Sequence, residues 1–297
     1  MNPIMFIRGS KMLRETVAQW KNINQTVALI PTMGALHKGH ISLVKHARQK
    51  AQKVIVSIFV NPLQFGPSED YNRYPRNLDQ DREMLSQAGV DALYAPDLID
   101  IYPNTFSTTV SIKGPAIVNL EDAARPTHFQ GVTTIVTKLL LQCLPNFAVF
   151  GEKDYQQLLV IKRLITDLDI PVEIIAVPTA REASGLALSS RNQYLSQSER
   201  GSAEQMFEIL YETIASVKQG TNMQEAIKTS KQEMMQMGFD VAYLEARHAL
   251  TLAPVHNAQE PTILLVAARL GQTRLIDNLL FERVRPDQPH TSLITPL

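Results

Sequence analysis

Two histidines three residues apart are the side chains of this chain best suited to chemistry. His37 and His40 lie in the stretch PTMGALHKGH, which follows an apolar run at 27–30 and precedes an amphipathic pattern. The start of a helix favours anions, and the glycines of this stretch let backbone N–H groups approach a ligand. Neutral imidazoles there can donate N–H bonds as negative charge grows on a phosphate. The segment therefore predicts a site for a nucleotide phosphate.

Other interpretations of this segment remain open from the residues alone. Gly34 and Gly39 have the spacing of a P-loop, but His40-Ile41 stands where that motif needs Lys followed by Ser or Thr. Two histidines can also bind zinc, although the other five histidines are scattered and no cysteine pair accompanies them. Finally, the histidines can simply cap the helix that they begin.

Three further polar segments can bind an anion or a small polar ligand. In 151–157 (GEKDYQQ), Lys153 can neutralise a phosphate, and Gln157 lies one helical turn beyond it on the same face. In 185–192 (GLALSSRN), two hydroxyls and Arg191 can form a mobile lid over a polyphosphate, although a hinge between domains would look similar. Asn61 and Gln64 can bind a ligand or merely satisfy the backbone of their own loop.

The elements that must position these residues alternate between strand and helix. Apolar or β-branched runs predict strands at 27–30, 54–60, 92–95, 148–150 and 172–177. Helical spacing predicts helices at 40–52, after Asn77 as far as Gly89, and at 130–144 and 154–168. This alternation predicts a Rossmann-like α/β fold with a doubly wound parallel sheet. Ligands of such sheets bind beyond the carboxyl ends of the strands, where the polar segments at 37–40, 61–66 and 151–154 fall.

The pattern changes after Arg181, which indicates a second domain. Ser196 to Glu199 predicts a capping box at the start of a long helix, and Thr221 is the expected cap of a helix ending at Gly238. Short strands are predicted at 241–246, 262–268 and 274–277, the last two joined in a hairpin through Gly271. We therefore expect a nucleotide-binding domain at 1–182, a smaller α+β lid domain at 183–297, and a disordered tail from about 287.

Composition narrows the classes of function. The chain has 29 basic and 29 acidic residues, so charge gives no support to a nucleic-acid or membrane partner. A single cysteine, Cys143, excludes an internal disulfide framework and fits a reducing compartment. No secretory signal or membrane-spanning apolar run is recognisable in the sequence. We expect a cytoplasmic protein that acts on small molecules.

Together, these motifs resemble the pantothenate synthetase family, ATP-dependent ligases that join pantoate to β-alanine. The resemblance rests on segments 31–40, 57–65, 125–132, 150–157, 185–192, 264–271 and 275–278, which follow the family's order. The His-x-Gly-His element alone is shared with class I aminoacyl-tRNA synthetases and nucleotidylyltransferases, and the segments around Gln64 and Gln157 narrow the choice. Lys38 and Gln80 depart from the acidic residues that many relatives carry.

The resemblance implies a fold, a two-step reaction and a set of site residues. Pantoate would attack the ATP α-phosphate to give a pantoyl adenylate and pyrophosphate, and β-alanine would then displace AMP. His40 would donate a proton, while His37, Lys153 and Arg191 would stabilise charge on the phosphates. The implied ATP-binding residues are Met33, Gly34, Ala35, Leu36, His37, Lys38, Gly39, His40, Gly151, Glu152, Lys153, Asp154, Ala180, Leu188, Ser189, Ser190 and Arg191.

The resemblance also implies residues for the other substrates and the metal. Gln64 and Gln157, with Asn61, Arg125 and His128, would bind pantoate and β-alanine. Mg²⁺ is expected on the polyphosphate, with Asp81 as a candidate ligand, and relatives are typically homodimers. A nucleotidyltransferase, an RNA-charging synthetase and a non-catalytic small-molecule-binding protein remain the alternatives.

Overall fold

The computed structural model describes residues 4–67 and 69–294, which divide into two compact units. Unit 1 runs to Val177 but leaves out 153–155, and these three residues belong with 178 onward to unit 2. The main change of unit thus falls between Val177 and Pro178, shortly before the expected domain boundary at 182/183. None of the described helices is both long and apolar enough to cross a membrane.

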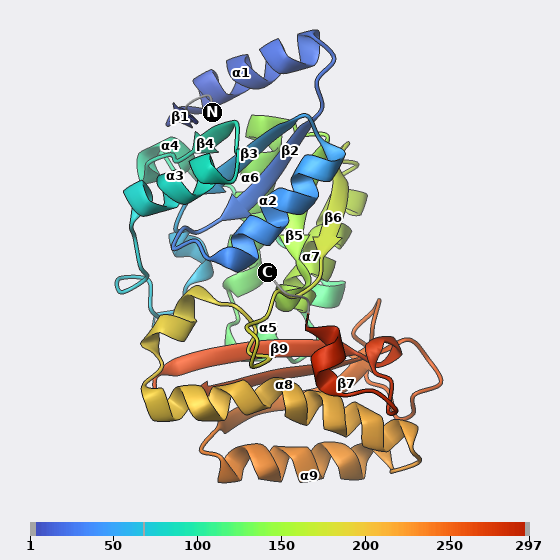
Figure 1. Ribbon diagram of the computed structural model, residues 1–297. Helices are drawn as coiled ribbons and strands as arrows, with labels where there is room; N and C mark the ends of the chain where they lie inside the picture. Colours follow the sequence, from blue (N-terminus) through green and yellow to red (C-terminus); the bar gives the residue numbers. More distant parts are fainter. Residues whose placement is uncertain (1–3, 68, 295–297) are drawn as a thin grey trace. The chain divides into compact units, whose positions relative to one another are not determined.

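Unit 1 contains a parallel sheet in the order β1-β4-β3-β2-β5-β6 (Figure 1). Its strands are β1 (Met5–Ile7), β2 (Val27–Thr32), β3 (Lys53–Ile58), β4 (Ala92–Tyr94), β5 (Phe147–Gly151) and β6 (Glu173–Val177). From β2 the chain order runs outward through β3 and β4 on one side and through β5 and β6 on the other, with β1 beyond β4. This doubly wound order confirms the predicted fold class. The edge strand β1 was not predicted, because three residues carry too little periodicity to be recognised.

Helices cover both faces of this sheet, so its central strands are buried on two sides. One apolar cluster includes side chains of α2 (Lys38–Lys50) and α3 (Leu78–Gln87), and the opposite cluster includes α1 (Ser10–Asn22), α6 (His128–Cys143) and α7 (Tyr155–Asp167). The predicted cap Asn77 accepts the Gln80 N–H, and Gly89 adopts a φ of +75° just after α3. Unit 1 also contains the short helices α4 (Leu98–Ile101) and α5 (Glu121–Ala124) and the 3₁₀ turns η1 (Pro62–Gln64), η2 (Gly114–Ala116) and η3 (Glu152–Asp154), although Lys153 and Asp154 of η3 belong to unit 2.

Unit 2 packs two long helices against an antiparallel sheet in the order β7-β8-β9. Its elements are η4 (Ser190–Tyr194), α8 (Gln197–Lys218), α9 (Met223–Gln236), β7 (Asp240–His248), β8 (Thr262–Leu270), β9 (Thr273–Leu280), η5 (Phe281–Arg283) and η6 (His290–Leu293). The capping box of Ser196 and Glu199 and the hairpin through Gly271 are confirmed. The cap of α9 is Asn222, not Thr221, since the Asn222 side chain accepts the first free N–H groups of the helix.

The disorder expected from about residue 287 does not apply to residues 287–294. The Tyr211 hydroxyl lies within hydrogen-bond reach of the Arg285 carbonyl, at 2.5 Å, and of the Gln288 carbonyl. Leu293 and Ile294 pack against the apolar cluster of unit 2. Buried apolar contacts and a hydrogen bond therefore order the segment that composition alone suggested was free, and residues 295–297 lie outside the described residues.

Candidate active site

The two histidines cap the helix that they begin. His37 is the N-cap of α2, and its Nδ1 accepts the Gly39 N–H at 3.1 Å. His40 Nδ1 accepts the His37 N–H at 3.2 Å, and the two ring centroids lie 4.1 Å apart. A nitrogen that accepts a hydrogen bond carries no proton, so the backbone assigns both rings the neutral tautomer with the proton on Nε2. Capping and a donor function are thus compatible, because the cap uses Nδ1 and the proton lies on Nε2.

A buried carboxylate holds the loop between β2 and α2. Asp81 Oδ1 accepts the Leu36 N–H at 2.7 Å, and Oδ2 accepts the Ala35 N–H at 3.0 Å. The loop needs this support because Ala35 adopts a φ of +51°. A Cβ at Gly34, where φ is +82°, would lie 3.0 Å from Asp81 Oδ2, so glycine allows the close approach. Burial raises the pKa of the Asp81 carboxyl, and the hydrogen bonds from Leu36 and Ala35 oppose that rise without cancelling it.

These contacts do not support Asp81 as a metal ligand. Both of its oxygens hold the loop backbone, and the side chain belongs to a residue that is only 3% exposed. Among residues 4–67 and 69–294, no group of three or more His, Cys, Asp and Glu side chains could hold a metal ion. In this structure the carboxylate that was expected to bind Mg²⁺ holds the backbone of the histidine loop.

The loop after β3 is built around Asn61, whose side chain is buried and fully hydrogen-bonded. Its Oδ1 accepts the Leu63 N–H at 3.3 Å and the Tyr102 hydroxyl at 2.8 Å. Its Nδ2 donates to the Gly131 carbonyl at 3.1 Å and to Gln64 Oε1 at 3.0 Å. In this structure Asn61 therefore orients Gln64, whereas the sequence led us to expect contact with substrate. Its amide hydrogens and its oxygen are already engaged by the protein.

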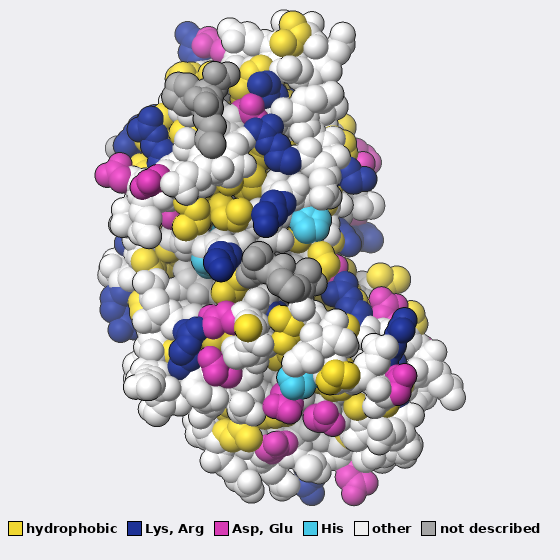
Figure 2. Space-filling view, viewed as in Figure 1, with side chains coloured by type: hydrophobic (Ala, Val, Ile, Leu, Met, Phe, Trp, Pro, Cys, Tyr) yellow, Lys and Arg dark blue, Asp and Glu magenta, His cyan; other side chains and the backbone are white. Residues whose placement is uncertain are grey.

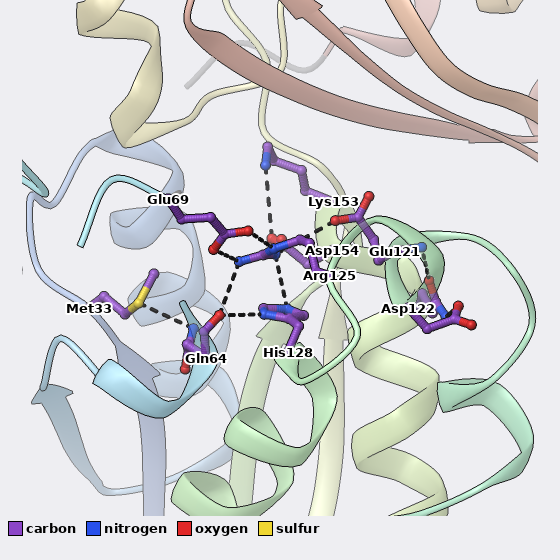
Figure 3. Close-up of polar contacts among 10 residues, drawn as sticks. Met33, Gln64, Glu69, Glu121, Asp122, Arg125, His128, Lys153 and Asp154 are labelled. Atoms are coloured by element: carbon purple, nitrogen blue, oxygen red, sulfur yellow. Dashed lines mark hydrogen bonds and ion pairs between the residues drawn. The ribbon is translucent and has the colours of Figure 1, made fainter. Parts of the chain in front are cut away.

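Arg125 and His128 also act on Gln64, through its backbone (Figure 3). His128 Nδ1 lies 3.0 Å from the Gln64 carbonyl oxygen, and Arg125 NH2 donates to the same oxygen at 3.3 Å. The Arg125 guanidinium is itself paired with both oxygens of Glu69, at 2.5 and 2.9 Å, and lies 3.2 Å from His128 Nε2. Arg125 and His128 were expected to line the substrate pocket; these contacts make them supports of the Gln64 segment.

The charges of this network are fixed over a wide pH range. Burial, followed by the positive charge of Arg125, lowers the pKa of the His128 imidazole to about 4. His128 is therefore neutral near pH 7, with Nδ1–H donating to the Gln64 carbonyl and Nε2 accepting from Arg125. Burial alone would raise the pKa of the Glu69 carboxyl, but the hydrogen bonds and charge of Arg125 outweigh burial and hold it below its usual value.

The two adjacent glutamines of α7 have different environments. Gln156 is buried, and its amide binds the Glu121 N–H, the Pro115 carbonyl and the Asp122 carboxylate. Gln157 is half-buried, and its side chain has no hydrogen-bond partner among the described residues of the chain. The structure thus assigns Gln156 to the interior, and the substrate-binding role of Gln157 stays a prediction.

Lys153 and Arg191, the other residues expected to meet phosphates, belong to unit 2. Lys153 Nζ lies 3.9 Å from Asp154 Oδ2, and its backbone carbonyl accepts the Asn278 amide at 2.9 Å. Arg191 lies in η4, where the Ser189 hydroxyl caps the turn by accepting the Arg191 N–H at 3.2 Å. Asn278, on β9, is thus a support of the Lys153 segment whose role no local pattern revealed.

The segment that leads to Arg191 forms a narrow loop with a fixed base. Leu188 N–H donates to the Ala180 carbonyl, and Arg181 pairs with Ala187 as an isolated antiparallel bridge. The Arg181 guanidinium is buried, binds both oxygens of Asp277 at 2.5 and 2.8 Å, and lies 3.8 Å from the centroid of the Phe207 ring. Gly185 packs on the same ring: a Cβ there would lie 2.9 Å from Phe207 Cδ1. Close packing, rather than hinge freedom, accounts for this glycine.

Within unit 1, the structure brings the histidine loop and Gln64 together. They follow the adjacent strands β2 and β3, and Gln64 Nε2 donates to Met33 Sδ at 3.3 Å. The sequence did not single out Glu69 and Tyr102, and it gave Asn278 no role beyond its place in the family segment 275–278. Each of the three holds a site segment from a distant part of the chain. Figure 2 shows basic and acidic side chains scattered over the displayed face among neutral and hydrophobic ones.

Comparison with known proteins shows which family the chain belongs to. The family model described as pantoate–β-alanine ligase matches residues 5–280. The chain belongs to the pantoate–β-alanine ligase family. A pantothenate synthetase of Rhodopseudomonas palustris is 46% identical over 278 residues, covering 93% of this chain and 98% of the relative. A pantothenate synthetase of Paramagnetospirillum magneticum is 48% identical over 277 residues, with coverages of 93% and 97%.

Solved structures of the same ligase family share the fold. The pantothenate synthetase of Thermus thermophilus superimposes with a TM-score of 0.89 at 44% identity, covering 94% of this chain and 99% of its own. The pantoate–β-alanine ligase of Francisella tularensis, solved in complex with β,γ-ATP and β-alanine, gives a TM-score of 0.81 at 36% identity, with coverages of 96% and 100%. These similarities confirm the resemblance inferred from the motifs.

Proposed function

We propose that this member of the pantoate–β-alanine ligase family joins pantoate to β-alanine by way of a pantoyl adenylate. The pantoate carboxylate attacks the ATP α-phosphate and pyrophosphate leaves; the β-alanine amine then attacks the acyl carbon and AMP leaves. Activation is needed because a free carboxylate is a poor electrophile. The family match over 5–280 and the Francisella relative bound to an ATP compound and β-alanine support this reaction.

One observation carries the proposal: the backbone fixes the tautomer of both histidines. Because Nδ1 of His37 and of His40 accepts a backbone N–H, each ring presents Nε2–H as a donor. A neutral donor gains strength as charge develops on a phosphate and does not require the imidazole to be charged at a helix start. His37 then stabilises the transferring phosphate, and His40 donates its proton on the leaving side.

The remaining nucleotide contacts are assigned by family likeness. Lys153 and Arg191 stabilise charge on the departing phosphates. The nucleotide is bound by Met33, Gly34, Ala35, Leu36, His37, Lys38, Gly39, His40, Gly151, Glu152, Lys153, Asp154, Ala180, Leu188, Ser189, Ser190 and Arg191. In this set the backbone N–H groups of Ala35 and Leu36 are engaged by Asp81, so these two residues contribute shape rather than those donors.

The acid is bound by the two glutamines. Gln64 turns its Nε2 away from Asn61, since its Oε1 accepts the Asn61 amide, and this leaves an N–H group for a hydroxyl or carboxylate oxygen of pantoate. Gln157 has no partner among the described residues and is assigned to the same substrate. Asn61, Arg125 and His128 contribute by holding Gln64, whose amide also contacts β-alanine.

Mg²⁺ enters with ATP, bound by the polyphosphate oxygens, as is usual for an ion that keeps most of its waters. The described residues hold no group of three or more His, Cys, Asp and Glu side chains that could bind a metal ion, so the ligands proposed for Mg²⁺ are phosphate oxygens and water. We further propose that the enzyme is a cytoplasmic homodimer that does not bind nucleic acid, in keeping with its family and its balance of 29 basic and 29 acidic residues.

Omission of each substrate tests the reaction. With ATP, Mg²⁺, pantoate and β-alanine present, AMP and pyrophosphate should appear in equal amounts. With β-alanine omitted, exchange of labelled pyrophosphate into ATP should continue, and with pantoate omitted it should stop. Exchange that requires β-alanine would refute a free-standing adenylation step, and AMP release without either acid would refute the ligase assignment.

A further inference from the structure

The hydrogen bonds around Asn61 have a direction that the backbone imposes. The Leu63 N–H can only donate and the Gly131 carbonyl can only accept, so Asn61 must place Oδ1 toward Leu63 and Nδ2 toward Gly131. The second hydrogen on Nδ2 then points to Gln64, whose facing atom must be the oxygen Oε1. Two backbone groups thereby decide which end of the Gln64 amide is left for a ligand.

Tyr102 completes this arrangement from outside the loop. Its hydroxyl donates to Asn61 Oδ1 at 2.8 Å, and its position in sequence is 41 residues from Asn61. The Tyr102 ring lies between Phe59 and Phe106, with ring centroids 5.9 and 4.9 Å away. Burial raises the pKa of the Tyr102 hydroxyl, so it remains a donor throughout the range in which the protein functions.

We propose that Tyr102 is a positioning residue for the acid substrate: through Asn61 it keeps Gln64 Nε2, which donates one hydrogen to Met33 Sδ, with its second N–H toward the ligand. This rests on the proposed role of Gln64. Rotation of the Asn61 amide would break its bonds to Leu63, Gly131 and Gln64, and it would turn the Tyr102 hydroxyl from a donor into an acceptor. Without the Tyr102 bond, three remain and the Oδ1 side is held by the Leu63 N–H alone, at 3.3 Å. If the Asn61 amide reverses, the Gln64 amide reverses with it. Gln64 Oε1, an acceptor, then faces the acceptor oxygens of the acid.

Tyr102→Phe tests the proposal, because it removes one oxygen and keeps the ring. We expect the KM for pantoate to rise roughly five- to tenfold, the equivalent of one neutral hydrogen bond, while the KM for ATP stays unchanged. Tyr94→Phe is the matched control: it removes a buried tyrosine hydroxyl that donates to an amide oxygen, that of Gln142, at 2.9 Å. Tyr94→Phe should lower the Tm by about as much as Tyr102→Phe does, and it should leave the KM of every substrate unchanged.

A mutant cycle with Gln64→Ala separates positioning from general damage. If Tyr102 acts through Gln64, adding Tyr102→Phe to Gln64→Ala should raise the pantoate KM by less than twofold further. A full five- to tenfold increase in that background, or equal increases in all three KM values, would overturn the proposal. If Gln64→Ala alone leaves the pantoate KM unchanged, the proposed role of Gln64 is wrong. If Gln64→Ala raises it but Tyr102→Phe does not, only the role of Tyr102 is wrong.

Discussion

Two loops of unit 1 follow neighbouring strands, yet they are held by different means. The histidine loop, residues 33–40, follows β2 and is held by one buried carboxylate, Asp81, and by two imidazoles that cap α2. The loop of residues 61–64 follows β3 and is held by the uncharged amide of Asn61 and by a buried network in which Arg125 is paired with Glu69. The first loop presents titratable side chains as its functional groups, and the second presents a neutral amide.

This difference determines where pH should act. A proton on Nδ1 of His37 or His40 would displace the backbone N–H that this atom accepts. Protonation would therefore break the capping hydrogen bond and convert the neutral imidazole into a cation. In the second loop, His128 stays neutral near pH 7 and Glu69 stays ionised, so Gln64 keeps its environment. We therefore expect pH to affect folding stability through His128, in the network behind Gln64.

The largest expected effect comes from His40→Ala. Loss of a positioned proton donor should lower kcat by roughly 100- to 10,000-fold, whereas loss of a capping contact should lower the free energy of unfolding by only about 1 kcal/mol. Steady-state kinetics and urea denaturation measure the two quantities. His46→Ala is the control, since His46 lies on the same helix and contacts only the Ser42 carbonyl among the hydrogen bonds assigned to it. A kcat within threefold of wild type would remove His40 from the chemistry.

The next effect concerns the pH dependence of stability. An unfolded imidazole takes up a proton near pH 6.5, but folded His128 does so only near pH 4. The unfolded state thus binds more protons within this window, so the stabilisation is complete above about pH 6.5 and is lost as pH falls toward 4. Its full size is on the order of 3 kcal/mol, of which about 2 kcal/mol is lost by pH 5.

Urea denaturation at pH 7 and pH 5 measures this loss. His128→Asn is the informative variant, since its amide can donate to the Gln64 carbonyl in the place of Nδ1 and does not titrate. Between pH 7 and pH 5, the free energy of unfolding of His128→Asn should fall by less than that of wild type. The difference between the two falls should be about 2 kcal/mol. Parallel falls for the two proteins would show that His128 is not the group responsible.

Asp81→Asn should change the free energy of unfolding least among these variants. It should, however, weaken nucleotide binding. The charged carboxylate is costly to bury, so its removal offsets part of the lost hydrogen bonding. The amide can accept only one of the two N–H groups from Ala35 and Leu36, and the loop should relax. We expect the KM for ATP to rise roughly tenfold and the KM for pantoate to change little. Asp79→Asn, an exposed change on the same helix, should leave both constants at their wild-type values.

Much of the fold could be predicted because its signals are local. The β-branched run that became β3 and the apolar spacing of α2 reflect periodicities that neighbouring residues establish by themselves. Ser196 and Glu199 likewise indicate the start of α8 within four residues. Where two adjacent residues are both good caps, as at Thr221 and Asn222, local chemistry does not decide between them; in the structure the Asn222 side chain accepts the free N–H groups.

The supports of the site could not be predicted, because each comes from a distant part of the chain. Asp81 reaches Leu36 across 45 residues, and Glu69 reaches Arg125 across 56. The family resemblance implied Asp81 as a metal ligand and Arg125 as a pocket residue, but the sequence did not show which distant groups engage these two side chains. His37, His40 and Gln64 were identified because they lie at strand ends, where the topology of a parallel sheet places ligands.

The central claim is that the histidine loop carries out nucleotidyl transfer while the Gln64 loop binds the acid. Pantoate-dependent exchange of pyrophosphate into ATP, followed over a range of pantoate concentrations, tests it directly. His40→Ala should lower the maximal exchange rate and leave the half-saturating pantoate concentration within twofold of wild type. Gln64→Ala should raise that concentration at least tenfold. If Gln64→Ala lowers only the maximal rate, or if His40→Ala acts mainly by weakening pantoate binding, the division between the two loops is wrong.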